Sequence, residues 1–161
     1  MATKLIKLPP PPGLKKAVIY DQKPAATQGG TFTSGAWRTR DLNTIEGDTG
    51  VVSISSNQFS LQAGSYMIYA TAPARDVDQH QTRLYNVTTS SVAAVGTAEK
   101  VSKGAQCPTS VLSTTLNIGS ASTFELQHKC LTSFGTSGFG TSSGIFSGQV
   151  DIYASLIILK L

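Results

Sequence analysis

The amino-acid sequence predicts a single all-β domain, either a sandwich or a barrel. Several segments of four to ten residues alternate apolar and polar side chains, turn residues separate them, and no segment has the 3.6-residue period of an amphipathic helix. Charged residues make up only 14% of the 161 residues, and Gly, Ser and Thr are abundant. This composition is typical of a β-rich chain with large, weakly polar contacts.

The first half of the chain contains four predicted strands. The apolar run AVIY at 17–20 is the first, and TFTSGAWRTRDL at 31–42 is the second. Apolar and polar residues alternate in 58–62, and a turn signal of small residues follows. The run SYMIYATA at 65–72 also alternates, and we expect Pro73 to end it.

The second half contains four further strands before the last one. These are QTRLYNV at 81–87, VAAV at 92–95, SVLSTTLNI at 110–118 and TFELQHKCL at 123–131. Gly119 is expected to end the third of them, because glycine favours turns over strand interiors.

Residues 150–161 (VDIYASLIILKL) form the last predicted strand, and both of its faces are apolar. Alternation places five side chains on the face that we expect to enter the core: Val150, Ile152, Ala154, Leu156 and Ile158. It places four on the face that we expect to contact other copies of the chain: Tyr153, Ile157, Leu159 and Leu161. The strand therefore favours an obligate oligomer, since a half-exposed antiparallel strand should alternate apolar and polar residues.

Residues 1–16 are predicted to be an extended N-terminal arm, and 17–161 the folded domain. Pro9, Pro10, Pro11 and Pro12 impose a polyproline conformation, and the apolar residues Leu5, Ile6 and Leu8 precede them. One interpretation is a disordered tail. The other is a stiff spacer with a short anchor peptide that docks on another protein.

The net charge of +4 belongs to the arm, which holds four lysines and no acid. Removing these four from the 13 basic residues leaves nine, which balance the nine acids of the chain. The domain therefore lacks the basic face that nucleic-acid binding requires. No run of 18 apolar residues predicts a membrane span, and the N-terminus does not have the pattern of a signal peptide.

The sequence contains no defensible catalytic constellation, and we expect no enzymatic activity, metal or cofactor. His128 shares the apolar face of its strand, so an interior or interface position is expected. Asp76 and Asp78 are either solvated loop charges or part of a calcium site. Cys130 should face the core as a small apolar residue, and a disulfide with Cys107 is geometrically feasible.

Residues 132–148 form a long loop in which thirteen of seventeen residues are Gly, Ser or Thr. A loop of this length inside a compact domain is usually functional or mobile. Its aromatic residues, which include Phe134 and Phe139, either meet a ligand or hold the loop against the domain or a neighbouring subunit.

Four segments together resemble the complement and tumour necrosis factor family of trimeric jelly rolls, in the version found in bacteriophage fibre and structural proteins. They are NQFSLQAGSYMIYATAPA, QTRLYNVTTSSVAAVGTAE, TLNIGSASTFELQHKC and FSGQVDIYASLIILKL, and the resemblance covers roughly 31–161. It implies a two-sheet antiparallel jelly-roll sandwich that assembles as a homotrimer, with the last strand near the threefold axis. It carries over no ligand-binding residue.

The leading hypothesis from the sequence is a non-enzymatic phage virion protein, assembled in the host cytoplasm. Its trimeric head would be fixed by the arm to a capsid or tail protein and would touch a host-surface glycan. Five loop residues are candidate contacts: Arg75, Asp76, Asp78, Phe134 and Phe139. The alternatives are a capsid decoration protein without receptor binding and, less favoured for want of paired carboxylates, a hydrolase of surface polysaccharide.

Overall fold

The computed structural model describes residues 13–101, 104, 107–144 and 148–161. These residues form eleven β-strands and no helix, so the all-β prediction is confirmed. The strands are β1 (Lys15–Lys23), β2 (Arg38–Thr39), β3 (Thr44–Gly47), β4 (Ser53–Ser55), β5 (Gln58–Leu61), β6 (Gly64–Pro73), β7 (Asp78–Asn86), β8 (Ser91–Val101), β9 (Thr109–Ile118), β10 (Ser122–Cys130) and β11 (Asp151–Lys160). Among the described residues, no helix has the length and apolar character needed to cross a membrane.

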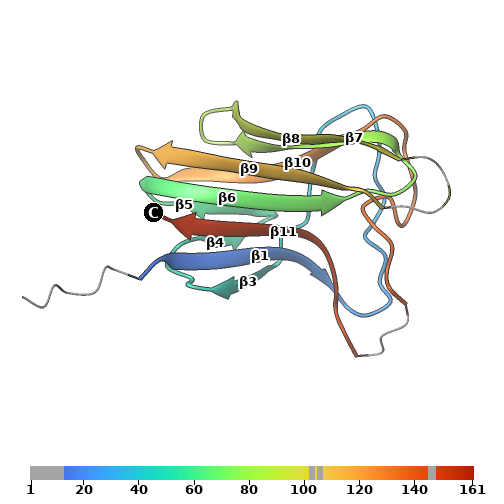
Figure 1. Ribbon diagram of the computed structural model, residues 1–161, viewed down its shortest axis with the longest axis horizontal. Helices are drawn as coiled ribbons and strands as arrows, with labels where there is room; N and C mark the ends of the chain where they lie inside the picture. The colour runs from blue at the N-terminus through green and yellow to red at the C-terminus, as the bar shows by residue number, and fades with distance from the viewer. Residues whose placement is uncertain (1–12, 102–103, 105–106, 145–147) are drawn as a thin grey trace, which may run out of the picture.

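The strands form two antiparallel sheets that pack face to face, as Figure 1 shows. Sheet I has the order β3-β1-β11-β6-β9, and sheet II has the order β4-β5-β10-β7-β8, with the short strand β2 added beside β10. Neighbours in each sheet are mostly far apart in the sequence, so the chain crosses repeatedly between the sheets. The predicted two-sheet jelly-roll sandwich is confirmed.

The main core lies between the two sheets and is almost entirely apolar. Ile68 of β6, Leu84 of β7, Leu126 of β10 and Leu156 of β11 are all fully buried there. Burying one such side chain contributes about 1.5–3 kcal/mol. Alternation in β6 points every second residue at this core, as the sequence predicts, and Pro73 ends the strand.

The prediction of strands was wrong in two places. Residues 31–42 do not form one long strand, because the chain here crosses from one sheet to the other. Only Arg38 and Thr39 pair with β10, and Phe32 forms an isolated bridge with Phe134. The short strands β3 and β4 at the sheet edges were also missed, since three or four residues give too little alternation to detect.

A β-bulge in β11 changes which residues face the core. Tyr20 pairs with Ser155 and Gln22 with Ile152, so β11 holds one extra residue at this point. Tyr153 and Ala154 are consequently both buried, at 6% and 0% exposure. The predicted core positions Val150 and Ile152 lie instead on the surface, at 50% and 49% exposure, because an extra residue reverses the faces of the strand.

One end of the sandwich gathers the connections 24–37, 74–77 and 131–144, and is called the loop end below (Figure 1). A second, smaller apolar cluster lies there: Phe32, Ala74, Val77 and Cys130, with Phe134 and Phe139 packed against it. Cys130 faces the interior as predicted, and burial raises the pKa of its thiol to about 11. Cys107 is exposed and both cysteines are free, so the disulfide is not formed.

Candidate functional site

The outer face of sheet I carries a group of apolar side chains, which we name the sheet I patch: Val18, Met67, Tyr69, Ile157 and Leu159. Val18, Ile157 and Tyr69 stand side by side across three strands, and Leu159 stands beside Met67. Met67 and Tyr69 are 43% and 42% exposed. The patch lies at the centre of the sheet, where β11 runs between β1 and β6.

Polar residues surround the sheet I patch. Glu46 lies beside Val18, Ser113 beside Tyr69 and Thr115 beside Met67 on the flanking strands. At the side toward the loop end, Thr71 and Ser155 hydrogen-bond to each other at 2.8 Å. An apolar centre with a polar rim is the usual anatomy of a protein–protein interface.

Of the four residues that the sequence predicts for a subunit interface, three lie on or beside the patch. Ile157 and Leu159 belong to it, and Leu161 is 65% exposed at its edge. Tyr153 does not face outward, because the bulge turns its side chain toward the interior of the domain. Its phenol donates a hydrogen bond to the backbone oxygen of Thr27, and burial raises its pKa to about 12.

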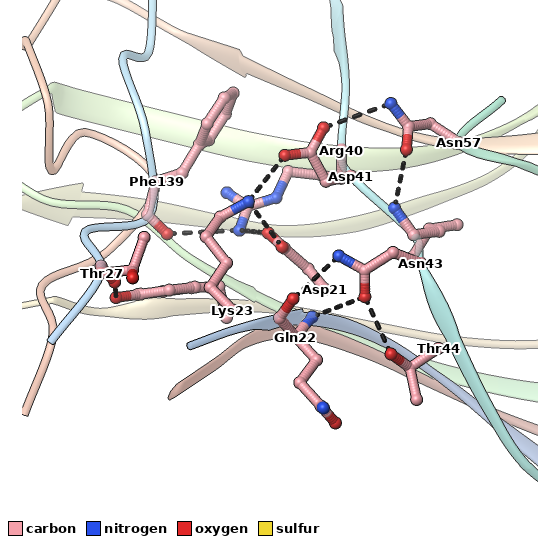
Figure 2. Close-up of polar contacts among 12 residues, drawn as sticks. Asp21, Gln22, Lys23, Thr27, Arg40, Asp41, Asn43, Thr44, Asn57 and Phe139 are labelled. Atoms are coloured by element: carbon pink, nitrogen blue, oxygen red, sulfur yellow. Dashed lines mark hydrogen bonds and ion pairs between the residues drawn. The ribbon is translucent and has the colours of Figure 1, made fainter. Parts of the chain in front are cut away.

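A buried ionic network joins the loop end to sheet I, as Figure 2 shows. The guanidinium of Arg40 is fully buried and lies 3.5 Å from the carboxylate of Asp21, which is 1% exposed. The ammonium of Lys23 bridges Asp21 and Asp41, at 3.1 and 2.8 Å. Burial lowers the pKa of Arg40 to about 10 and raises that of Asp21.

Arg40 also holds the loop that precedes β11. It donates hydrogen bonds to the backbone oxygens of Pro73 and Phe139, at 3.3 and 3.2 Å, and its guanidinium lies 4.2 Å from the centre of the Phe139 ring. Phe139 stacks in turn on Phe32, with ring centres 4.4 Å apart. This packing requires Gly138, since a Cβ atom there would lie 2.7 Å from Phe32.

The loop residues that the sequence offers as ligand contacts make contacts within the chain. Phe134 and Phe139 pack on the second cluster, which agrees with the interpretation that aromatic residues hold this loop to the domain. Arg75 forms an ion pair with Asp76 at 3.2 Å and lies 5.8 Å from the Phe134 ring. It also donates a hydrogen bond to Thr141 at 2.9 Å.

The two aspartates of this set have different hydrogen-bond partners. Asp76 is 7% exposed and accepts a hydrogen bond from the backbone amide of Gly104 at 2.8 Å. Asp78 accepts a hydrogen bond from the Thr132 hydroxyl. In the part of the chain that the structure describes, no three His, Cys, Asp or Glu side chains are placed to hold a metal ion.

The structure brings together two histidines that are 48 residues apart in the sequence. Nδ1 of His80 and Nε2 of His128 lie 2.9 Å apart, so one ring donates a hydrogen bond to the other. His128 is completely buried beside Phe32 and Phe139, and His80 is 3% exposed. Burial lowers the pKa of His80 to about 4 and that of His128 well below its usual value, with the charge of Arg40 adding to both effects.

The predicted anchor residues of the arm, from Leu5 to Pro12, lie outside the described residues. The described part of the arm shows where it leaves the domain. Lys15 pairs with Lys160, so β1 begins beside the end of β11, at the opposite end of the sandwich from the loop end (Figure 1). β1 also begins two residues before the predicted domain boundary at residue 17.

No protein-family model and no curated protein sequence matches the chain. Solved structures match it in fold. The crystal structure of murine APRIL has a TM-score of 0.54 and 9% identity, covering 91% of this chain and 100% of that one. The globular domain of zebrafish complement 1qA protein has a TM-score of 0.52 and 11% identity, covering 91% of this chain and 97% of that one. The chain therefore has the jelly-roll fold of the tumour necrosis factor and C1q proteins.

Proposed function

We propose that this chain forms the head of a homotrimeric, non-enzymatic fibre or spike on a bacteriophage virion. The observation that carries the proposal is the sheet I patch. Contiguous apolar patches on a protein surface often mark protein–protein interfaces, especially when polar residues surround them. Three copies that meet through these faces would cover it, and the sequence resemblance to phage jelly rolls supports both the trimer and the virion.

The arm supplies the attachment in this proposal. A polyproline spacer keeps an apolar anchor peptide at a distance from the head, where it binds a capsid or tail protein of the same particle. β1 starts at the end of the sandwich opposite the loop end, so the loop end would point away from the particle. Three copies in one head give avidity, which allows each contact with a host surface to be weak.

Light scattering on a sizing column tests the trimer directly. The purified protein is expected at about three times the 16.9 kDa mass of the chain, and to keep this mass on dilution. Tyr69→Lys places a charge in the patch and should yield a folded monomer. The matched control is Val95→Lys, because Val95 is 57% exposed on sheet II and should leave the trimer intact.

A monomer from the unmodified chain would contradict the assembly, and a trimer with Tyr69→Lys would contradict the proposed interface. The virion assignment has its own test, because deletion of residues 1–13 should leave the trimer intact and abolish its incorporation into particles. Normal incorporation of the shortened chain would overturn the proposed role of the arm.

A capsid decoration protein is the second candidate, and one observation favours it. The loop residues Arg75, Phe134 and Phe139 are engaged in packing and hydrogen bonds, so they offer less to a ligand than an open loop would. Adsorption to host cells separates the two roles. Particles that lack the protein should adsorb poorly if it is a spike, and normally but with reduced shell stability if it is a decoration protein.

A further inference from the structure

The outer face of sheet II differs from that of sheet I, because aromatic and planar polar side chains cover it. The guanidinium of Arg83 on β7 contacts two aromatic rings, 4.2 Å from the centre of Trp37 and 4.9 Å from that of Tyr85. Trp37 comes from the segment just before β2, which pairs with β10. The indole is therefore held over the sheet by a stacked cation.

A chain of hydrogen bonds fixes Arg83 in this position. Its Nε donates to Gln127 at 2.8 Å, and the Gln127 amide donates to Glu125 at 2.6 Å. Glu125 accepts two further hydrogen bonds, from Gln58 at 2.8 Å and from Thr39 at 2.9 Å. Side chains on three neighbouring strands and β2 thus position the aromatic stack before any ligand arrives.

A shallow pocket of about 240 Å³ adjoins Trp37 on this face. Its lining includes Gln79 and Gln81 of β7, Lys129 of β10 and the exposed Leu131. Gln79 and Gln81 precede Arg83 on the outer face of β7, at steps of two residues. Arg83 itself does not line the pocket. Trp37 therefore both contacts the guanidinium of Arg83 and lines the pocket.

The pocket has the chemistry of a saccharide site. An indole wall packs against the C–H face of a sugar ring, and planar amides and amines hydrogen-bond its hydroxyl groups. The Gln81 amide is oriented by a hydrogen bond to the backbone oxygen of Gly96 at 2.9 Å. Within the described residues, the side chains of Gln79 and Lys129 make no hydrogen bond, so their polar groups are available to a ligand.

Charge around the pocket favours an acidic sugar. Lys129 lines it, and Lys100 pairs with the lining residue Gln79 on the next strand. Both side chains are exposed. Two acids lie near it: Glu99, which pairs with His80 and accepts a hydrogen bond from Thr97 at 2.7 Å, and Glu125, whose oxygens accept from three donors. A carboxylate on the ligand would complement the ammonium of Lys129.

We propose that this pocket on the outer face of sheet II binds an acidic saccharide, with a sugar ring against Trp37 and its carboxylate at Lys129. This inference rests on the proposed function, because it names the class of ligand that the chain would bind on the host surface. The pocket and the sheet I patch lie on opposite outer faces of the sandwich. A trimer formed through the patch would therefore leave all three pockets open to a multivalent glycan.

The single tryptophan makes the site directly measurable, because all indole fluorescence comes from Trp37. The full-length protein is titrated with trigalacturonic acid and with an oligosialic acid, and maltotriose serves as the neutral probe. At least one acidic probe should change the emission, with maltotriose weaker by roughly tenfold or more, the loss expected when a charge-assisted contact is removed.

Two variants and a control assign the effect to the pocket. Lys129→Ala should weaken binding of the acidic probe by roughly tenfold, and Trp37→Ala should abolish it in saturation-transfer NMR. Lys15→Ala removes an exposed lysine from β1 and should change nothing. Circular dichroism checks that each variant is folded.

The proposal is overturned if neither acidic probe binds, if maltotriose binds equally well, or if Lys129→Ala binds like the unmodified protein. Light scattering on the same samples keeps this outcome separate from the proposed function. A trimer that binds no acidic probe would refute only the pocket, whereas a monomer that binds one would refute only the assembly.

Discussion

The main core and the loop end are built in different ways. The main core is packed from apolar side chains such as those of Ile68 and Leu126. The loop end instead buries Arg40 with Asp21 and His80 with His128, and links its segments through them. Apolar burial does not depend on one particular partner, whereas a buried charge or histidine requires its partner. The loop end should therefore be the region more sensitive to substitution.

The largest effect is expected from Arg40→Met at the loop end. This change leaves the carboxylate of Asp21 without its fully buried partner and should lower the free energy of unfolding by about 3–5 kcal/mol. Urea denaturation measures the loss. The double variant Asp21→Asn with Arg40→Met should recover part of it, and Arg38→Met, at an exposed position, should change stability by less than about 0.5 kcal/mol.

Leu126→Ala probes the main core in the same assay. It should lower the free energy of unfolding by about 3 kcal/mol, since it removes a fully buried leucine and leaves a cavity between the sheets.

The comparison becomes sharper with a thiol reagent in a Cys107→Ser background, where labelling of Cys130 reports on opening of the loop end. Arg40→Met should expose Cys130 before global unfolding and Leu126→Ala should not, and equal labelling of both variants would contradict a distinct loop end.

Gly140→Ala should cost about 2 kcal/mol, because overpacking a filled site forces its neighbours to move. A Cβ atom at Gly140 would lie 2.5 Å from the ring of Tyr153, and its φ of +134° disfavours any other residue. Gly135→Ala in the same loop is the matched control, since nothing lies within 4 Å of its Cβ position. Thermal unfolding that ranks the two variants equally would show that the loop is not packed on Tyr153.

The histidine pair predicts that stability falls in mild acid. Both pKa values are lower in the folded chain than the ordinary 6.5, so the unfolded chain binds more protons below that pH. The contribution of the pair to the free energy of unfolding is fully present above about pH 6.5. It is lost progressively as the pH falls toward about 4, the folded pKa of His80.

Within that range, each histidine should lower the free energy of unfolding by about 1.4 kcal/mol for each unit by which the pH falls. Urea denaturation at about pH 7.5 and pH 5.5 measures the slope, which His80→Gln should reduce by roughly half. Asp21 has a raised pKa and contributes with the opposite sign, but it is present in both proteins and cancels in the comparison. An unchanged slope in His80→Gln would refute the role of the pair.

Alternation in the sequence predicted the main core well and the loop end poorly. In β6 and β9 every second side chain turns inward, so their orientation follows from the pattern alone. Alternation cannot reveal an inserted residue, which is why the bulge reversed Tyr153 and Ile152. An arginine on a polar segment also predicts exposure, so nothing local indicated that Arg40 is buried.

The histidine pair and the sheet II pocket depend on pairing between distant strands. The sequence did contain one usable signal, because alternation extended back from Leu84 through Thr82 puts His80 on the inner face. The predicted strand began at residue 81 and stopped short of it. Trp37 was assigned to a strand, and only the register of β2 with β10 brings its ring over Arg83.

The pairing of Lys15 with Lys160 also matters for protein engineering. A second domain fused after Leu161 would emerge beside Gly13, and cargo at either junction would leave the loop end and the outer face of sheet II uncovered. The chain could then serve as a display scaffold, with its carrier at one end of the sandwich and grafted peptides at the other.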